Sequence, residues 1–115
     1  MDDFMVRSKA VKLYSLVAPN MEQMQKVQRY SIGIKFEHTC LNLLERIIEG
    51  ENSPRVIRQG VVTQVIVNAE IAKVQLRLLM DRHLVQEANY FTWAELLQEI
   101  VKMAQGWKTS LIAKP

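Results

Sequence analysis

Apolar residues recur at steps of three and four along most of this chain, and that spacing constrains its fold more than any other feature. In one long segment the recurring residues are Val61, Val65, Ala69, Ala72, Leu76 and Leu79. In a later segment they are Trp93, Leu97, Ile100, Ala104, Trp107 and Leu111. A helix with this spacing carries one apolar face along its whole length. The pattern therefore predicts long helices whose apolar faces pack together.

Few residues interrupt these segments. The chain has 4 Gly and 3 Pro among 115 residues, too few for the many turns of an all-β fold. We predict helices over residues 3–17, 22–49, 54–82 and 86–112, with Gly50 ending the second and Ser53-Pro54 starting the third. The β-branched run from Val61 to Val67 also suits a strand, but helical spacing continues through it. Short connections favour an all-α, antiparallel up-down four-helix bundle, with residues 1–115 as one domain.

The first two predicted helices have less regular apolar faces. The predicted core residues are Ala10, Leu13, Tyr14 and Val17 in the first helix, and Val27, Tyr30, Ile34, Leu41, Leu44 and Ile48 in the second. Glu37 falls on this second face, and a buried carboxylate needs a partner. Two alternatives stay open: Glu37 pairs with Arg77, or it lies at the edge of the face and reaches water.

The second and third helices each carry an additional apolar face. These residues are Ile32, Phe36, Leu43 and Ile47 in the second helix, and Val67, Ile71, Val74 and Leu78 in the third. One alternative is deep burial of both helices, for instance beneath the first helix. The other is a contact between subunits, because a monomer rarely exposes so large an apolar surface. We expect a homo-oligomer with an interface formed by Ile32, Phe36, Val67, Ile71 and Leu78.

The residue patterns of common enzymes are missing from this sequence. It has no Gly-rich phosphate loop and no Ser or Cys nucleophile motif, and His38 and His83 stand far apart. Cys40 is the only cysteine, and its apolar neighbours indicate a core position. No signal-peptide pattern or membrane-length apolar run is present. We expect a cytoplasmic protein without enzymatic activity, cofactor, metal or membrane contact.

The charge balance is mildly basic, with 15 Lys and Arg against 12 Asp and Glu. On the third helix, Arg55, Lys73 and Arg77 share one strip, and Lys35 and Arg46 align on the second. A single strip of this kind is usually a solvated surface. Repeated around an oligomer, however, it becomes a belt of positive charge, and phosphate binding grows with the number of contacts. Because both Trp residues lie on a predicted core face, charge and shape would drive such binding.

Several segments resemble the accessory variability determinant (Avd) proteins of diversity-generating retroelements. The resemblance begins at residues 28–37 (QRYSIGIKFE) and continues through 41–45 and 47–49. It resumes at residues 69–79 (AEIAKVQLRLL) and 99–108 (EIVKMAQGWK). In the last segment the family usually has Gly-Gly-Trp, where this chain has Gln105-Gly106-Trp107. The similarity covers most of the chain after Pro19.

The resemblance implies a basic four-helix bundle that forms a homopentamer. Avd proteins bind nucleic acid and the retroelement's reverse transcriptase, and they support error-prone copying of a template RNA into cDNA. The matching positions imply Arg29, Lys35 and Arg77 as nucleic-acid-binding residues, followed by Lys73 and Lys108. Arg77 has an alternative role as an ion-pair partner of Asp81, and Arg29 one as a packing residue through its stem. Two other functions stay open: a four-helix protein of the kind encoded by ribosomal RNA intervening sequences, and a protein-only helical adaptor.

Overall fold

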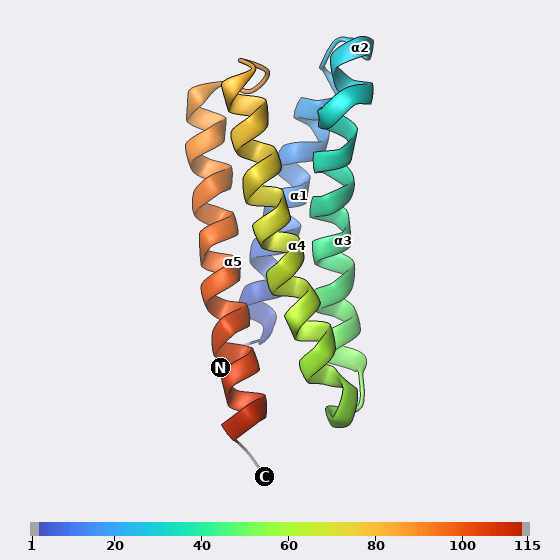
Figure 1. Ribbon diagram of the computed structural model, residues 1–115, viewed down its shortest axis with the longest axis vertical. Helices are drawn as coiled ribbons and strands as arrows, with labels where there is room; N and C mark the ends of the chain where they lie inside the picture. The colour runs from blue at the N-terminus through green and yellow to red at the C-terminus, as the bar shows by residue number, and fades with distance from the viewer. Residues whose placement is uncertain (1–2, 114–115) are drawn as a thin grey trace.

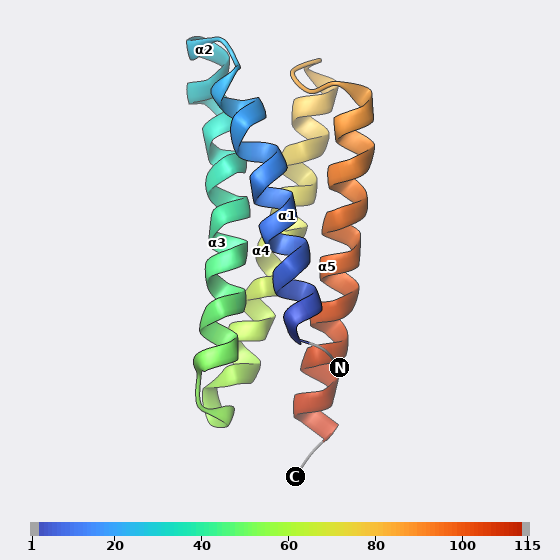
Figure 2. The same ribbon diagram turned by 180° about the vertical axis from the view of Figure 1, so that it is seen from behind.

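A computed structural model describes residues 3–113, which form a bundle of helices (Figures 1 and 2). The elements are α1 (Asp3–Glu22), α2 (Lys26–Gln28), the π-helical turn η1 (Arg29–Gly33), α3 (Ile34–Asn52), α4 (Arg55–Asp81) and α5 (Glu87–Ala113). The short α2 and η1 lead directly into α3, so the three make one rod. No strand occurs within residues 3–113. The predicted all-α helical bundle is confirmed.

Each rod packs against two others, and the four close into a ring. The packed pairs are α1 with α3, α3 with α4, α4 with α5, and α5 with α1. The α1–α2 and α4–α5 connections lie at one end of the bundle, and the α3–α4 connection lies at the other (Figure 1). At that other end, α1 starts well short of the α3–α4 connection, as the view from behind shows (Figure 2). The bundle measures 50 × 21 × 19 Å.

The first helix is longer than predicted. We expected it to end at Val17, before Pro19, but α1 continues through Pro19 to Glu22. Proline lacks the N–H of a helical hydrogen bond, which usually ends or kinks a helix. Here the last turn is held by Met21, which is buried in the core. Asn20 adds a hydrogen bond from its Nδ2 to the Leu16 carbonyl at 2.8 Å.

The second rod begins later and is less regular than the predicted single helix. It starts at Lys26 rather than Glu22, and its backbone departs from helical geometry at Ser31 (φ −88°, ψ −105°). The Ser31 hydroxyl donates a hydrogen bond to the Gln28 carbonyl at 2.7 Å. Gly33 follows, and a Cβ there would lie 2.9 Å from the sulfur of Met24. A side chain at position 33 would therefore displace the side chain of Met24.

The residues between α3 and α4 have roles other than those predicted. Gly50 does not end the helix but lies inside α3, which continues to Asn52. Ser53 is not the N-cap of α4, because its hydroxyl donates to the Glu49 carbonyl of the preceding helix at 2.6 Å. Pro54 holds the N-cap position, with φ −57° and ψ 149°. A Ser-Pro pair can therefore close one helix as well as open the next.

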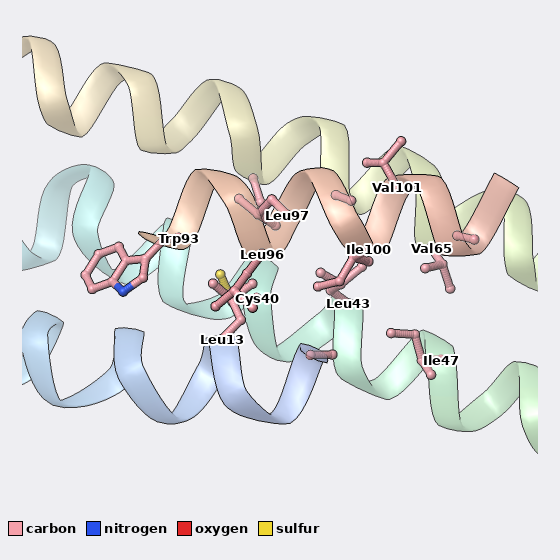
Figure 3. Packing of buried hydrophobic residues seen from close by; sticks show 14 of the residues in the cluster. Leu13, Cys40, Leu43, Ile47, Val65, Trp93, Leu96, Leu97, Ile100 and Val101 are labelled. Atoms are coloured by element: carbon pink, nitrogen blue, oxygen red, sulfur yellow. The ribbon is translucent and has the colours of Figure 1, made fainter. Parts of the chain in front are cut away.

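The core runs along the bundle axis between the four rods (Figure 3). The core stripes predicted for the third and fourth helices are confirmed from Val65 to Leu79 and from Trp93 to Trp107. Leu13 and Val17 of α1 are buried as predicted. Near one end of the cluster the rings of Phe36 and Trp93 stack, with centroids 6.1 Å apart and planes inclined by 27°.

The predicted faces of the second helix are wrong. The buried face of α3 holds Phe36, Cys40, Leu43 and Ile47, three of which we had placed on the additional apolar face. Of the predicted core residues, Val27 and Tyr30 are 86% and 59% exposed. The buried face also includes Gly33 and Gly50, so it is less apolar in sequence than the outer face. Its small residues make room for large neighbours, which a hydropathy pattern does not show.

Candidate assembly and nucleic-acid-binding surfaces

An apolar stripe lies on the surface of α4, opposite its buried face. We call it the α4 stripe, and it consists of Val67, Ile71, Val74 and Leu78. The four side chains are between 42% and 62% exposed. They follow one another at steps of three and four, so they form a continuous line along the helix. Val56 and Ile57, in the first turn of α4, are also exposed and were missed by the sequence prediction.

The α4 stripe borders a shallow hollow of about 460 Å³. Its lining includes Ile66, Val67, Ile71 and Val74, so its walls are mainly aliphatic. Exposed aliphatic side chains in a continuous hollow are typical of a protein contact surface, because their transfer from water is favourable. The structure thus leaves three of the predicted interface residues, Val67, Ile71 and Leu78, free to contact a partner.

The two predicted interface residues before α4 are placed differently. Phe36 is fully buried between the helices, where it stacks on Trp93. Its assignment to a subunit interface is therefore corrected: it is a core residue. Ile32 is partly buried and packs against the same core. The physical reason is that α3 is rotated about its own axis relative to the prediction, so the face predicted to point outward points into the core.

Two of the predicted nucleic-acid-binding residues take part in surface ion pairs. Lys73 Nζ lies 3.0 Å from Glu70 Oε1, and it also donates a hydrogen bond to Gln98 Oε1 at 2.9 Å. Arg77 Nε lies 3.1 Å from Asp81 Oδ1, and this hydrogen bond raises the pKa of Arg77. Exposed pairs of this kind are weak and exchange readily with other anions. The charges remain accessible, but the neighbouring carboxylates offset part of their attraction for phosphate.

The other three predicted cations have no ion pair within the described residues. Lys35 is exposed on α3, and Lys108 is partly buried on α5. Arg29 is partly buried on η1, and its Nε is enclosed without a hydrogen-bond partner. Lys35 is therefore the most accessible unneutralised charge among the five predicted residues.

The five predicted cations do not form one patch on the chain. Arg29 and Lys35 lie near the end of the bundle that contains α2, whereas Lys108 lies near the C-terminal end of α5 (Figure 1). Lys73 and Arg77 lie on α4, on the side that faces α5. A phosphate backbone that followed them would have to run along the bundle or join several copies of the chain.

Glu37 does not pair with Arg77, whose partner is Asp81. The carboxylate of Glu37 is partly buried, and its Oε1 has no hydrogen-bond partner. The nearby residue from the facing helix is Tyr14. Burial raises the pKa of the Tyr14 hydroxyl, and the charge of Glu37 raises it further. Both effects favour the protonated form of the Tyr14 hydroxyl.

Cys40 is fully buried, as predicted, and this burial raises the pKa of its thiol well above the ordinary value. A protonated, enclosed thiol is a poor nucleophile. Within residues 3–113, no cluster of three or more His, Cys, Asp or Glu side chains is arranged to hold a metal ion. None of the described helices combines the length and apolar character needed to cross a bilayer.

Comparison with known proteins adds no relative to this description. A scan against protein-family models finds no match for the chain, and searches of curated proteins and of solved structures find no significant match.

Proposed function

We propose that this chain is a non-enzymatic, cytoplasmic accessory protein of a diversity-generating retroelement. In this proposal the helices form an antiparallel up-down bundle that assembles into a homo-oligomer, with a pentamer expected from the Avd resemblance. The oligomer binds the template RNA and the reverse transcriptase that copies it. The α4 stripe is the observation that carries the proposal, because a monomer would leave this continuous apolar line in water.

Assembly also gives a role to the dispersed cations. One chain offers Arg29 and Lys35 near one end of the bundle and Lys108 near the C-terminal end of α5, which is a weak electrostatic site for a polyanion. Copies arranged around a symmetry axis would place each cation at the same level along that axis, once per copy. The number of phosphate contacts would therefore grow with the number of copies. RNA affinity should therefore depend on assembly as well as on charge.

The test is solution mass by light scattering, at low and moderate salt, with and without a structured RNA. The proposal expects an oligomer that binds the RNA and releases it as salt rises. A monomer that ignores RNA would contradict it. An oligomer that ignores RNA would instead favour the protein-only adaptor, whose partner would dock in the aliphatic hollow beside the α4 stripe.

A charge reversal separates specific cations from general basicity. Lys35→Glu should weaken RNA binding and reduce its salt dependence, since it removes one phosphate contact and adds repulsion. Lys12→Glu is the matched control, because Lys12 is also exposed without an ion pair among the described residues. Equal losses in both variants would show that only net charge matters, and would remove Lys35 from the proposed site.

A further inference from the structure

A cavity of about 490 Å³ lies at the end of the bundle that contains α2. Its walls come from the α1–α2 connection and from the α4–α5 connection, which lie at the same end of the molecule (Figure 1). The volume is within the range of small-ligand sites in proteins. Its lining includes no residue of the α4 stripe and none of the five predicted cations, although Arg29 and Lys35 lie at the same end of the bundle.

The wall of this cavity is rich in neutral carboxamides. Four glutamines line it: Gln23, Gln25, Gln28 and Gln86. None of their amides is hydrogen-bonded to another described residue, so each can donate and accept toward a ligand. No Lys, Arg, Asp or Glu side chain is part of the lining that the structure describes, although His83 is. The cavity therefore suits a neutral group that has donors and acceptors side by side.

Trp93 closes the inner side of the cavity. In Figure 3 it lies at one end of the core cluster, apart from the other labelled side chains. The residue is 1% exposed. Its indole N–H has no hydrogen-bond partner among the described residues. The indole nitrogen is not fully enclosed. A buried indole N–H usually has a partner, and a ligand acceptor in the cavity would supply one.

A cation lies beside this neutral cavity. A second hollow shares Gln28 and Leu84 with it, and its lining includes Arg82. Arg82 is exposed and forms no ion pair with a described residue. A guanidinium binds phosphate through two parallel hydrogen bonds. The two adjoining hollows thus combine an amide-lined chamber with a guanidinium group at its edge.

We infer that this end cavity binds an unpaired nucleobase of a single-stranded RNA segment, with the adjoining phosphate at Arg82. A carboxamide presents a donor and an acceptor in one plane, as base edges do, and glutamine pairs with bases in this way. Proteins that read RNA sequence accept splayed-out bases from single strands and loops. The inference rests on the proposed function for the source of the base, but it concerns a different surface and adds base recognition to charge-driven binding.

The binding experiment uses the full chain and three RNA hairpins. One hairpin is blunt, one has a short single-stranded extension, and the third has the same extension without bases. Fluorescence anisotropy at one salt concentration should show the intact extension bound about tenfold more tightly than the abasic one. Gln28→Ala combined with Gln86→Ala should abolish this preference. Gln105→Ala, an exposed glutamine near the far end of α5, is the control and should preserve it.

A second measurement addresses the cavity without a long RNA. Titration with adenosine or cytidine monophosphate should shift the indole N–H signal of Trp93 in nitrogen-15 spectra, while Trp107 at the other end should not respond. Equal binding of intact and abasic extensions would overturn the inference but leave the proposed function standing. If no hairpin binds, the proposed function fails, and the Trp93 signal then decides: a saturable shift supports the cavity as a base site, and an unchanged signal overturns it.

Discussion

Gly50 of α3 lies directly against the indole ring of Trp107 of α5. A Cβ added to Gly50 would lie only 2.9 Å from Cη2 of that ring. The helices α3 and α5 are not a packed pair, because they lie diagonally across the ring of four rods. The first helix, α1, stops short of this end (Figure 2). The indole of Trp107 reaches from α5 to Gly50 of α3. The large side chain of Trp107 and the lack of a side chain at Gly50 together allow the core to close at this end.

Gly50→Ala should destabilise the protein, although alanine favours a helix more than glycine does. The new methyl group would collide with the buried ring of Trp107, and overpacking of this kind typically costs about 1–3 kcal/mol. The measurement is the free energy of unfolding from urea denaturation, followed by circular dichroism.

Gly60→Ala is the matched control for that substitution. Gly60 is also inside a long helix, but nothing lies within 4 Å of an added Cβ. The free energy of unfolding should therefore rise by up to about 1 kcal/mol, from helix propensity alone. The packing account would be wrong if both variants were stabilised to the same extent.

Trp107→Ala should lower the free energy of unfolding by about 3–5 kcal/mol, enough to unfold much of the population. Combining it with Gly50→Ala gives a sharper test than the single variant. Without the ring, the methyl group has space, and Gly50→Ala should become stabilising in this background. An unchanged penalty in the double variant would mean that Trp107 is not what excludes a side chain at position 50.

Ile71→Lys and Leu78→Lys should each yield a smaller species that is still helical. Both residues lie on the α4 stripe, and a buried, unpaired ammonium would oppose contact between subunits. The measurement is solution mass by light scattering, with circular dichroism for helicity. Val11→Lys is the control, because Val11 is about as exposed as Ile71 but lies on α1. If all three variants kept the parent mass, the stripe would not be the interface.

Stability should fall in alkaline solution because of Cys40. The folded thiol keeps its proton well above the ordinary pKa of 9.0, whereas the unfolded thiol loses it there. Above pH 9 the unfolded chain therefore binds fewer protons, and the free energy of unfolding decreases by up to about 1.4 kcal/mol per pH unit. Cys40→Ala should remove this slope between pH 9 and 10, as measured by urea denaturation at each pH. A slope unchanged by the substitution would assign the effect to other groups.

The helical class and the buried faces of α4 and α5 could be predicted because their core positions hold large apolar residues at unbroken spacing. The face of α3 could not. Its inward positions include Gly33 and Gly50, which contribute little to a hydropathy pattern, and a side chain at either one would collide with Met24 or Trp107. That complementarity depends on which residue of another helix lies opposite, and no local pattern contains it.

The candidate surfaces were predictable to a similar degree. Val67, Ile71 and Leu78 were found from spacing alone, since α4 follows one regular helical period from end to end. Phe36 was misplaced together with the rest of its helix. The end cavity depends on the break after α1 and on the α4–α5 connection, whose relative position comes from the packed helices. The four glutamines are scattered along the sequence, and nothing in their spacing indicates that they line the same cavity.

The order of the rods around the bundle also has a consequence for how the chain acquires its structure. Helices consecutive in sequence are neighbours in space from α3 through α5, and α1 packs on α3 across a short connection. Contacts of this kind close small loops, which favours rapid folding. The contact between α1 and α5 is different, because it joins the two ends of the chain and must close nearly its whole length. This seam should form late and open first, with Lys9 and Glu99, 3.1 Å apart across it, among the first partners to separate.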